Sequence, residues 1–242
     1  FNFIPISALK GDNVVNRSKH MPWYEGPTLL YSLENIQVAN DTNHLDFRLS
    51  IQTVIRPKTK EHHDFRGYAG RISSGILRVG DEITVLPSQL KSTVKMIHGA
   101  QGEVKEGFAP QSVCIELEDD LDVGRSSMIV KNNNQPDQSQ EIDAMICWLG
   151  DQPMNLNNKY IIKHTTIEGR ALIKEIVYSL DLNTISRRTG ETQIKMNDIA
   201  RIKLKTNTPL FYDAYRKNRA TGSFILIDEN NFNTVGAGMI NH

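Results

Sequence analysis

The side chains that could carry acid-base or metal chemistry are scattered along this sequence. His62 and His63 stand between Glu61 and Asp64, and both side-chain types serve as metal ligands and general bases. Adjacent residues of an extended chain point to opposite sides, so two neighbouring imidazoles are poorly placed to bind one ion. We interpret this segment as a solvated loop and predict no metal site.

The remaining candidates for acid-base catalysis are equally isolated. His98 and His164 end or interrupt segments with the pattern of strands, which favours a surface or hydrogen-bonded histidine over a catalytic one. Asp119, Asp120 and Asp122 close such a segment and are expected to form an exposed turn. Since the order of Ser, His and Asp residues alone identifies no triad, we predict no catalytic residue in this chain.

The basic residues could instead bind an anion. Arg187 and Arg188, with Arg170 and Lys174 nearby in the sequence, could meet an acidic partner or a nucleotide phosphate, although a solvated turn is the simpler interpretation. The 28 Lys and Arg residues balance 28 Asp and Glu residues, so no global positive field is available to hold nucleic acid. The sequence also lacks the G-x-x-x-x-G-K-[ST] loop that cradles nucleotide phosphates.

The length and composition of the chain limit the folds that can position these residues. A chain of 242 residues is long enough for two modest domains. The composition is ordinary, with 39% hydrophobic residues, and no apolar run approaches the ~20 residues that span a membrane. Cys114 and Cys147 stand in separate apolar segments and are expected to be buried, reduced thiols of a cytoplasmic protein. Residues 1–9 lack the features of a signal peptide. The start without Met predicts a piece of a longer protein whose first residues lie in a strand.

Alternation with period two is the dominant pattern and is typical of half-buried strands. The residues expected to face the interior are Phe47, Leu49, Ile51, Thr53, Ile83, Val85, Ile202 and Leu204. The residues expected to face water are Arg48, Ser50, Gln52, Glu82, Thr84, Arg201, Lys203 and Lys205. Helical periodicity is convincing only over residues 27–35, where Pro27 suits the start of a helix.

Turn signals divide these strands at short intervals, at residues 80–81, 99–102, 107–110 and 190–191. This rhythm favours barrels or sandwiches over alternating strands and helices. The polar segment 131–140 (KNNNQPDQSQ) predicts an exposed linker. We therefore divide the chain into residues 1–40, 41–131 and 132–242, the last two each about the size of one closed barrel.

A family resemblance begins in the first segment. Residues 7–13 (SALKGDN) resemble the last guanine-contacting motif of translational-type GTPases. The resemblance implies that the backbone of Ser7, Ala8 and Leu9 helps to hold the base. The residue types suit this role, because small side chains let the chain approach a planar ring and backbone N–H groups can donate to its exocyclic oxygen.

Two further segments extend the resemblance. Residues 21–30 (MPWYEGPTLL) are similar to the segment before the second domain in large subunits of bacterial sulfate adenylyltransferases. Trp23 and Tyr24 are expected to pack at a junction between domains, because large aromatic side chains bury well there. Residues 68–87 resemble the second-domain stretch G-R-[VI]-x-x-G-x-[LIV]-x-x-G-[DE]-x-[VI] of elongation-factor-like GTPases, in which Gly75 and Gly80 suit turns with positive φ.

The second block resembles the third domain of the same large subunits, over residues 144–149, 156–164, 170–184 and 208–240. Bacterial elongation factor Tu carries Gly/Arg-rich insertions for tRNA where this sequence has DLNT at residues 181–184. The resemblance covers nearly the whole chain. It implies an all-β fold of two consecutive antiparallel β-barrels, of the elongation-factor domain 2 and domain 3 type, after a short end of an α/β GTP-binding domain.

The resemblance also implies a function. In this family the large, regulatory subunit hydrolyses GTP with Mg²⁺ and is coupled to a catalytic small subunit, which converts ATP and sulfate to adenosine 5′-phosphosulfate and pyrophosphate. The expected partners are that small subunit and the chain's own GTP-binding domain. Without a phosphate-binding loop, the barrels are expected to be a non-catalytic interaction platform that binds no cofactor and is inactive alone. The alternatives are translation-factor-type barrels that bind tRNA or a release factor, and an unrelated all-β binding module.

Overall fold

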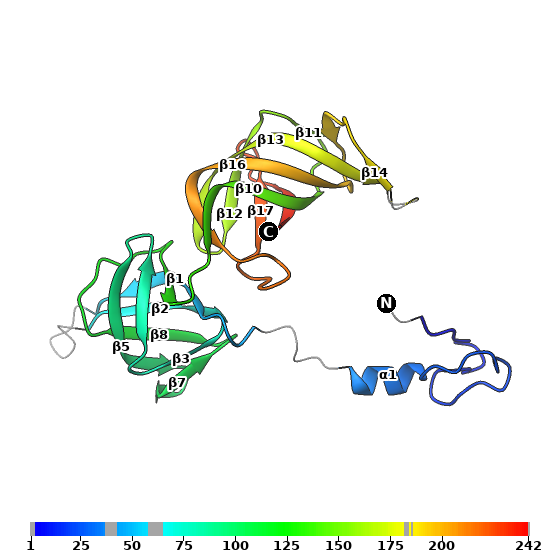
Figure 1. Cartoon of the computed structure of the whole chain (residues 1–242), viewed down its shortest axis with the longest axis horizontal. Coiled ribbons are helices and arrows are strands. Elements are labelled where there is room, and N and C mark those ends of the chain that lie inside the picture. The colour runs from blue at the N-terminus through cyan, green and yellow to red at the C-terminus, as the bar shows by residue number, and fades with distance from the viewer. Residues whose placement is uncertain (1–2, 37–42, 58–64, 182–183, 185, 242) are drawn as a thin grey trace. The chain divides into compact units, whose positions relative to one another are not determined.

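The computed structural model describes residues 3–36, 43–57, 65–181, 184 and 186–241. The chain forms two compact units, Phe1–Asp41 and Thr42–His242. Helix α1 (Leu29–Asn35) belongs to the first unit, and all the named strands belong to the second. The predicted all-β class with two antiparallel barrels is confirmed (Figure 1).

The first unit consists of a looped segment followed by α1. Thr28 caps the helix, because its backbone is extended and its hydroxyl accepts a hydrogen bond from the Tyr31 amide at 3.4 Å. Pro27 therefore directly precedes the cap, close to its predicted place. Residues 3–6, which the sequence predicts to lie in a strand, form none. A strand needs a neighbour for its backbone hydrogen bonds, and the described part of this unit supplies no neighbouring strand.

The first barrel is a closed ring of six antiparallel strands. Their order around the ring is β4 (Glu82–Leu86), β9 (Met128–Lys131), β1 (Arg48–Ile55), β2 (Gly67–Ser74), β8 (Ser112–Leu117) and β5 (Leu90–Gly99), and β5 pairs with β4 to close it. Strand β6 (Gly102–Val104) extends the sheet at β5, while β3 (Ile76–Arg78) pairs with β7 (Glu106–Phe108). Buried side chains such as Leu49, Ile72 and Ile115 fill the interior.

The second barrel repeats this architecture. Its ring order is β12 (Lys159–His164), β17 (Ser223–Ile227), β18 (Thr234–Ile240), β10 (Asp137–Trp148), β16 (Ile199–Tyr212) and β13 (Ile167–Asp181), and β13 pairs with β12 to close it. Strand β14 (Ser186–Arg188) extends β13, while β11 (Met154–Asn155) pairs with β15 (Gln193–Ile194). The core includes Trp148, whose ring meets that of Tyr160 edge-on with centroids 5.5 Å apart.

The alternating pattern predicts the inward side chains well, but three of its water-facing assignments are wrong. Arg48, Ser50 and Thr84 are only 0%, 6% and 0% exposed. They lie on the outer face of the first barrel, beside Met128 and Val130 of β9. That face is covered, because Met128 and Val130 belong to the same buried cluster as the core of the second barrel. The pattern identifies the inside of a strand but not a second burial surface on its outside.

One inward assignment is also wrong. Thr53 is exposed, whereas Val54 packs against the core of the first barrel. The pairing of β1 with β2 has a register irregularity between Ile51 and Thr53. Such a bulge turns the following side chains to the opposite face. The alternating pattern therefore assigns the residues after the bulge to the wrong side of the strand.

The segment 131–140, predicted to be an exposed linker, is only partly one. Lys131 still belongs to β9, and Asp137 already begins β10, where it pairs with Tyr212 of β16. Between them, Asn134 is hydrogen-bonded to Arg48 and to Asp46. Polar side chains of this segment hydrogen-bond to buried polar groups at the barrel junction. Composition alone does not distinguish such side chains from solvated ones.

Candidate functional site

The SAL loop, defined as residues 7–13, is a tight turn that closes on itself. The Ser7 amide donates to the Asp12 carbonyl at 3.2 Å, and the Gly11 amide donates to the Ser7 carbonyl at 2.8 Å. Gly11 has φ +73° and Asn13 has φ 56°, a region that glycine adopts freely and asparagine tolerates. The loop is therefore held in one shape by its own backbone.

Asn13 anchors the SAL loop and is only 1% exposed. Its Nδ2 donates to the Pro5 carbonyl at 2.9 Å, and its Oδ1 accepts from the Ser18 amide at 2.8 Å. Its own carbonyl accepts from the Leu29 amide at 2.9 Å, which ties the loop to the first turn of α1. The motif contained Asn13, but its sequence gave no sign that this side chain would be the buried anchor.

The three residues predicted to contact guanine differ in their surroundings. Ser7 is engaged in the hydrogen bonds of the loop, and its hydroxyl also accepts from the Lys10 amide at 3.3 Å. Ala8 and Leu9 are exposed, and their amides have no hydrogen-bond partner in the described part of the chain. Two neighbouring free N–H groups on a loop with a small side chain could donate to a carbonyl oxygen on a planar ring.

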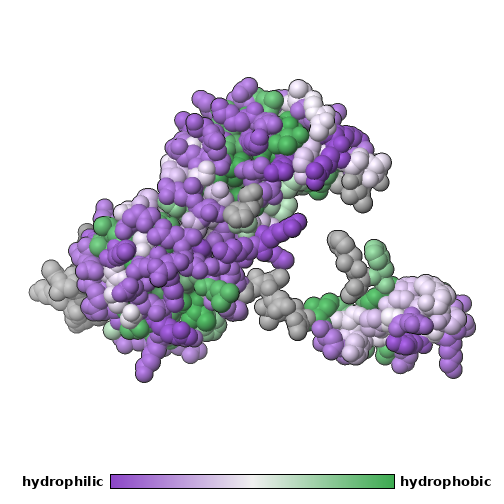
Figure 2. Space-filling view, in the orientation of Figure 1, coloured by the Kyte–Doolittle hydropathy of each residue, from purple (hydrophilic) through white to green (hydrophobic). Residues whose placement is uncertain are grey.

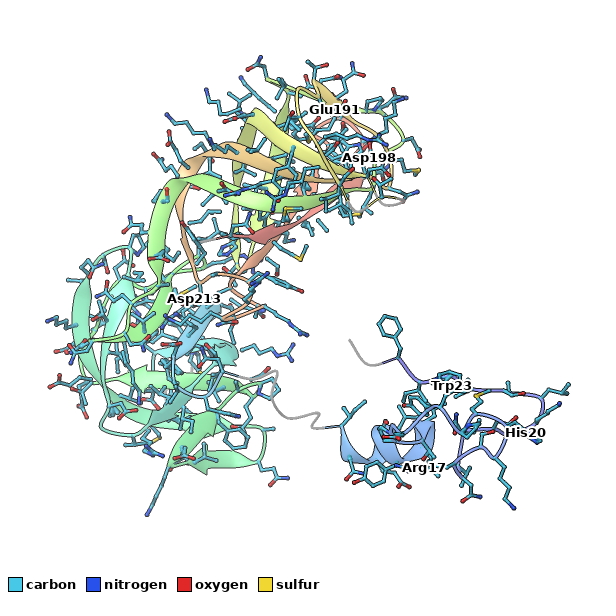
Figure 3. The ribbon with its side chains drawn as sticks, turned by 45° about the vertical axis from the view of Figure 1, so that its right-hand side comes forward. Arg17, His20, Trp23, Glu191, Asp198 and Asp213 are labelled. Atoms are coloured by element: carbon cyan, nitrogen blue, oxygen red, sulfur yellow. The ribbon has the colours of Figure 1, made fainter. Side chains whose placement is uncertain are left out.

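The packing predicted for Trp23 is not provided by its own unit. Trp23, labelled in Figure 3, is 70% exposed. Its ring meets that of Tyr24 edge-on, with centroids 6.3 Å apart. Phe3, Leu9 and Leu33 are likewise 87%, 95% and 59% exposed. Large apolar side chains that are this exposed are available for contact with another surface.

The second candidate site is the junction cluster of the barrels, comprising Arg48, Asp213, Asn134, Thr221 and Asp46. Arg48 is fully buried, and its Nε and Nη2 donate to the two carboxylate oxygens of Asp213 at 2.9 and 2.8 Å. Its Nη1 donates to the Asn134 carbonyl at 2.7 Å and to the Asn134 side chain at 2.9 Å. Arg48 lies on β1 and Asp213, labelled in Figure 3, follows β16, so this two-pronged pair joins the two barrels.

The partners of Arg48 are themselves held in place. Asp213 also accepts from the Thr221 hydroxyl at 2.8 Å. Asp46 accepts from the side chains of Asn134 and Lys217, at 2.5 and 3.2 Å. Burial raises the pKa of Asp46, but the hydrogen bonds from Asn43, Asn134 and Lys217 outweigh it, so this pKa lies below its usual value. Asp46 therefore stays ionised as part of the cluster.

His164 closes the junction cluster from the second barrel. It is fully buried at the end of β12, and its Nε2 lies 2.7 Å from the Thr221 carbonyl. Burial lowers the pKa of His164, against smaller raising effects of the Thr221 carbonyl and the Asp213 charge. The neutral ring must therefore carry its proton on Nε2 and donate it to that carbonyl. The prediction of a hydrogen-bonded histidine agrees with this position.

The other candidate residues stay apart from one another. His98 Nε2 lies 2.7 Å from a carboxylate oxygen of Glu116. Asp120 and Asp122 are exposed, as predicted, and both pair with Arg66. Asp119 instead accepts from the Ser92 hydroxyl at 2.8 Å.

The four basic residues also fail to form one anion site. Arg170 pairs with Glu229 at 3.1 Å, and Arg188 pairs with Asp181. The Arg187 guanidinium lies 4.7 Å from the centre of the Tyr178 ring. Lys174 is exposed on β13. Each arginine thus has its own local partner.

The remaining predictions concern the histidine segment 61–64, the two cysteines, metal binding and membrane spans. Glu61, His62, His63 and Asp64 lie outside the described residues. Cys114 and Cys147 are free and only partly buried, and burial raises the pKa of the Cys114 thiol. Within the described ranges, no group of three or more His, Cys, Asp or Glu side chains is placed to hold a metal ion. None of the helices described there is long and apolar enough to cross a membrane.

Comparison with known proteins agrees with the resemblance seen in the sequence. Residues 141–241 match the family of GTP-eEF1A C-terminal domain-like proteins. The chain is 47% identical, over 98% of its length, to the bifunctional enzyme CysN/CysC of Mycobacterium tuberculosis. It is 44% identical, over 98% of its length, to sulfate adenylyltransferase subunit 1 of Bacteroides fragilis. The predicted resemblance is confirmed, and the chain spans 39% and 49% of the lengths of these two relatives.

Solved structures support the fold. Sup35 complexed with GDP matches with a TM-score of 0.73 at 20% identity, covering 98% of this chain and 58% of that protein. The elongation factor SelB of Methanococcus maripaludis matches with a TM-score of 0.64 at 15% identity, covering 88% of this chain and 45% of that one. At such low identity these matches concern the arrangement of the barrels alone.

Proposed function

Starting from the similarity to sulfate adenylyltransferase subunit 1, we propose that this chain is the two-barrel portion of the GTP-hydrolysing regulatory subunit of a cytoplasmic sulfate adenylyltransferase. The complete enzyme would convert ATP and sulfate to adenosine 5′-phosphosulfate and pyrophosphate, with GTP hydrolysis coupled to that transfer. The barrels contribute no catalytic group. They carry the GTP-binding domain and bind the catalytic small subunit.

The junction cluster is the observation that carries this role. An interaction platform must keep its shape when a partner binds to one of its barrels. The buried pair of Arg48 with Asp213 fixes the two barrels to each other. Breaking such a pair leaves an uncompensated buried charge, which is strongly unfavourable. Both barrels lie within one compact unit, Thr42–His242, and this pair ties them together.

The SAL loop supports the GTP-binding part of the proposal. The free amides of Ala8 and Leu9 would contact the guanine base. The phosphates and Mg²⁺ require a Gly-rich loop with a Lys and a Ser or Thr, which this sequence does not contain. This chain would thus supply one side of a base-binding site and none of the hydrolytic groups.

Binding to the purified catalytic small subunit tests the proposal. We expect the 242-residue chain to elute with that subunit in size-exclusion chromatography, and to show neither GTP hydrolysis nor synthesis of adenosine 5′-phosphosulfate by itself. Either activity in the isolated chain, or no complex under conditions where the full regulatory subunit forms one, would contradict it. Salt-dependent binding of tRNA would favour the translation-factor alternative instead.

A further inference from the structure

The interface between the two barrels contains buried polar side chains of two kinds. Those of the junction cluster have protein partners, as Arg48 has in Asp213. The hydroxyls of Ser50 and Thr166 and the Nδ1 of His164 have no hydrogen-bond partner among the described residues. Polar groups on the largely hydrophilic outer surface of the barrels (Figure 2) can bond to bulk water. Ser50, Thr166 and His164 cannot, because they are only 6%, 6% and 0% exposed.

Ser50 faces this interface from strand β1 of the first barrel. It is directly paired with Met128 of β9, on the outer face of that barrel. Side chains of directly paired residues lie next to each other, and Met128 belongs to the same buried cluster as the core of the second barrel. The Ser50 hydroxyl therefore lies in the part of β1 that the second barrel covers.

Thr166 and His164 approach the same interface from the second barrel. His164 ends β12, and Thr166 lies in the short turn between β12 and β13. The hydroxyl of Ser126, two residues before Met128 in the first barrel, donates to the Thr166 carbonyl at 3.3 Å. This hydrogen bond places the turn of the second barrel against the first barrel, beside β9.

The three unpaired groups need both donors and acceptors. His164 Nε2 donates to the Thr221 carbonyl at 2.7 Å, so Nδ1 of the neutral ring is an acceptor that lacks a donor. The hydroxyls of Ser50 and Thr166 can each donate one hydrogen bond and accept others. Buried polar groups in folded proteins are nearly always hydrogen-bonded, to protein or to ordered water. A water molecule both donates and accepts, and buried waters typically bond to polar groups that lack protein partners.

The charges at the interface do not select an ion as the partner of these groups. Serine and threonine hydroxyls and a neutral imidazole carry no net charge. The buried charges of the junction cluster, on Arg48 and Asp213, already neutralise each other. A buried ion would need an opposite charge beside it. The partner that fits is therefore small, neutral and able to donate and accept hydrogen bonds.

We propose that the interface between the barrels encloses ordered water that hydrogen-bonds to Ser50 Oγ, Thr166 Oγ1 and His164 Nδ1. A bridging water is nearly as favourable in enthalpy as a direct hydrogen bond. The direct pair of Arg48 with Asp213 and the enclosed water then stabilise different parts of one interface. The water belongs to the junction itself, whatever partner the barrels bind.

The sign of a stability change separates a wet interface from a dry one. Thr166→Val keeps the shape of the side chain and removes its hydroxyl. If water bonds to that hydroxyl, the unfolding equilibrium constant from urea denaturation should rise about fivefold, because a hydrogen bond is lost. In a dry interface the constant should fall, because an unpaired buried group is removed. Ser50→Ala should change it in the same direction as Thr166→Val. Thr53→Val, exposed on β1, is the control and should change it by less than about twofold.

A crystal structure of the unchanged chain tests the water directly and does not depend on the folding of any variant. We expect ordered water within roughly 2.7–3.2 Å of Thr166 Oγ1, Ser50 Oγ and His164 Nδ1. Ordered waters elsewhere on the barrels of the same crystal would serve as the control. A dry interface, or hydroxyls that turn to pair directly with protein groups, would overturn the proposal. So would unfolding constants that do not rise in Thr166→Val and Ser50→Ala.

Discussion

The barrels bury their large apolar side chains, whereas the N-terminal unit leaves many of them exposed. In the barrels, Phe47 and Leu49 are fully buried and Trp148 is 2% exposed. In the unit Phe1–Asp41, Leu9 and Trp23 are 95% and 70% exposed. A unit of roughly 40 residues is near the lower limit of what can bury its own core, whereas each closed barrel encloses one.

This difference separates two kinds of stability. The barrels are stabilised by their own cores and by the junction cluster, so changes there should alter unfolding directly. The N-terminal unit holds its shape through hydrogen bonds around Asn13, and its apolar side chains add little until another surface covers them. Variants in the barrels and in the N-terminal unit should therefore differ in their effect on unfolding.

The largest effect is expected from breaking the junction pair. Arg48→Ala should lower the free energy of unfolding by about 3–5 kcal/mol, because Asp213 is left buried without its partner. Urea denaturation measures the change.

Two further variants isolate the cause. Arg78→Ala removes an exposed pair with Glu106 and should cost less than about 1 kcal/mol. Arg48→Met with Asp213→Leu should recover much of the loss, since no buried charge remains. Equal small losses for Arg48→Ala and Arg78→Ala would mean that the junction is not desolvated.

A smaller effect is expected from adding a methyl group at a turn of the first barrel. Gly75 has φ +77°, and a Cβ there would lie 2.5 Å from the Cα of Phe47. Gly75→Ala should therefore cost about 3 kcal/mol, from the left-handed backbone and the clash together. Gly80→Ala has a similar φ of +89° but open space around it, and should cost about 1 kcal/mol. Thermal unfolding of both variants would separate strain from clash.

The buried histidine of the junction predicts a pH dependence. Burial lowers the pKa of His164 below its unfolded value of about 6.5. Above that pH both states are neutral, and below it only the unfolded state takes up the proton. The free energy of unfolding should therefore decrease as the pH is lowered from about 6.5 to the pKa of the folded state. The decrease should be up to about 1.4 kcal/mol per pH unit.

Unfolding midpoints measured between pH 7.5 and 5.5 would show this slope. His164→Gln should flatten it, while His20→Gln, exposed in the N-terminal unit, should leave it unchanged. An unchanged slope in His164→Gln would assign the pH dependence to other groups.

The smallest effect on unfolding is expected in the N-terminal unit. Trp23→Ala should change the free energy of unfolding of the barrels by less than about 0.5 kcal/mol, because the side chain is already exposed. Fluorescence quenching by acrylamide provides the structural readout. With Trp148→Phe the remaining Trp23 should be readily quenched, and with Trp23→Phe the remaining Trp148 should be protected. Protection of Trp23 would contradict the exposure of this side chain.

Much of the fold could be read from local patterns. The alternation at Ile83, Val85, Ile202 and Leu204 identifies buried strand positions, because the pleat of a strand has a fixed period of two. Gly75 and Gly80 have the positive φ that their turns require. The motif at residues 7–13 places a tight loop correctly, while the roles of Ser7, Ala8 and Leu9 toward a guanine base stay predictions.

The errors share one cause. Arg48 and Thr84 are polar residues at positions that the alternating pattern assigns to solvent. The pattern gives no sign that a second barrel covers that side of the strand. The polar segment around Asn134 looked like a solvated linker for the same reason. Thr53 was misplaced by a bulge, which depends on pairing with β2 rather than on the residues of β1 alone.

Residues close together along the chain suffice to predict the strands, the turns and the likeness to the large subunits of sulfate adenylyltransferases. Arg48 and Asp213 are 165 positions apart, and the buried pair that they form between the barrels emerges only in the folded structure. The fold also places Met128 and Val130 of β9 under the second barrel, in the buried cluster that forms its core. Both features depend on how the two barrels pack against each other, which the pattern along a single strand does not report.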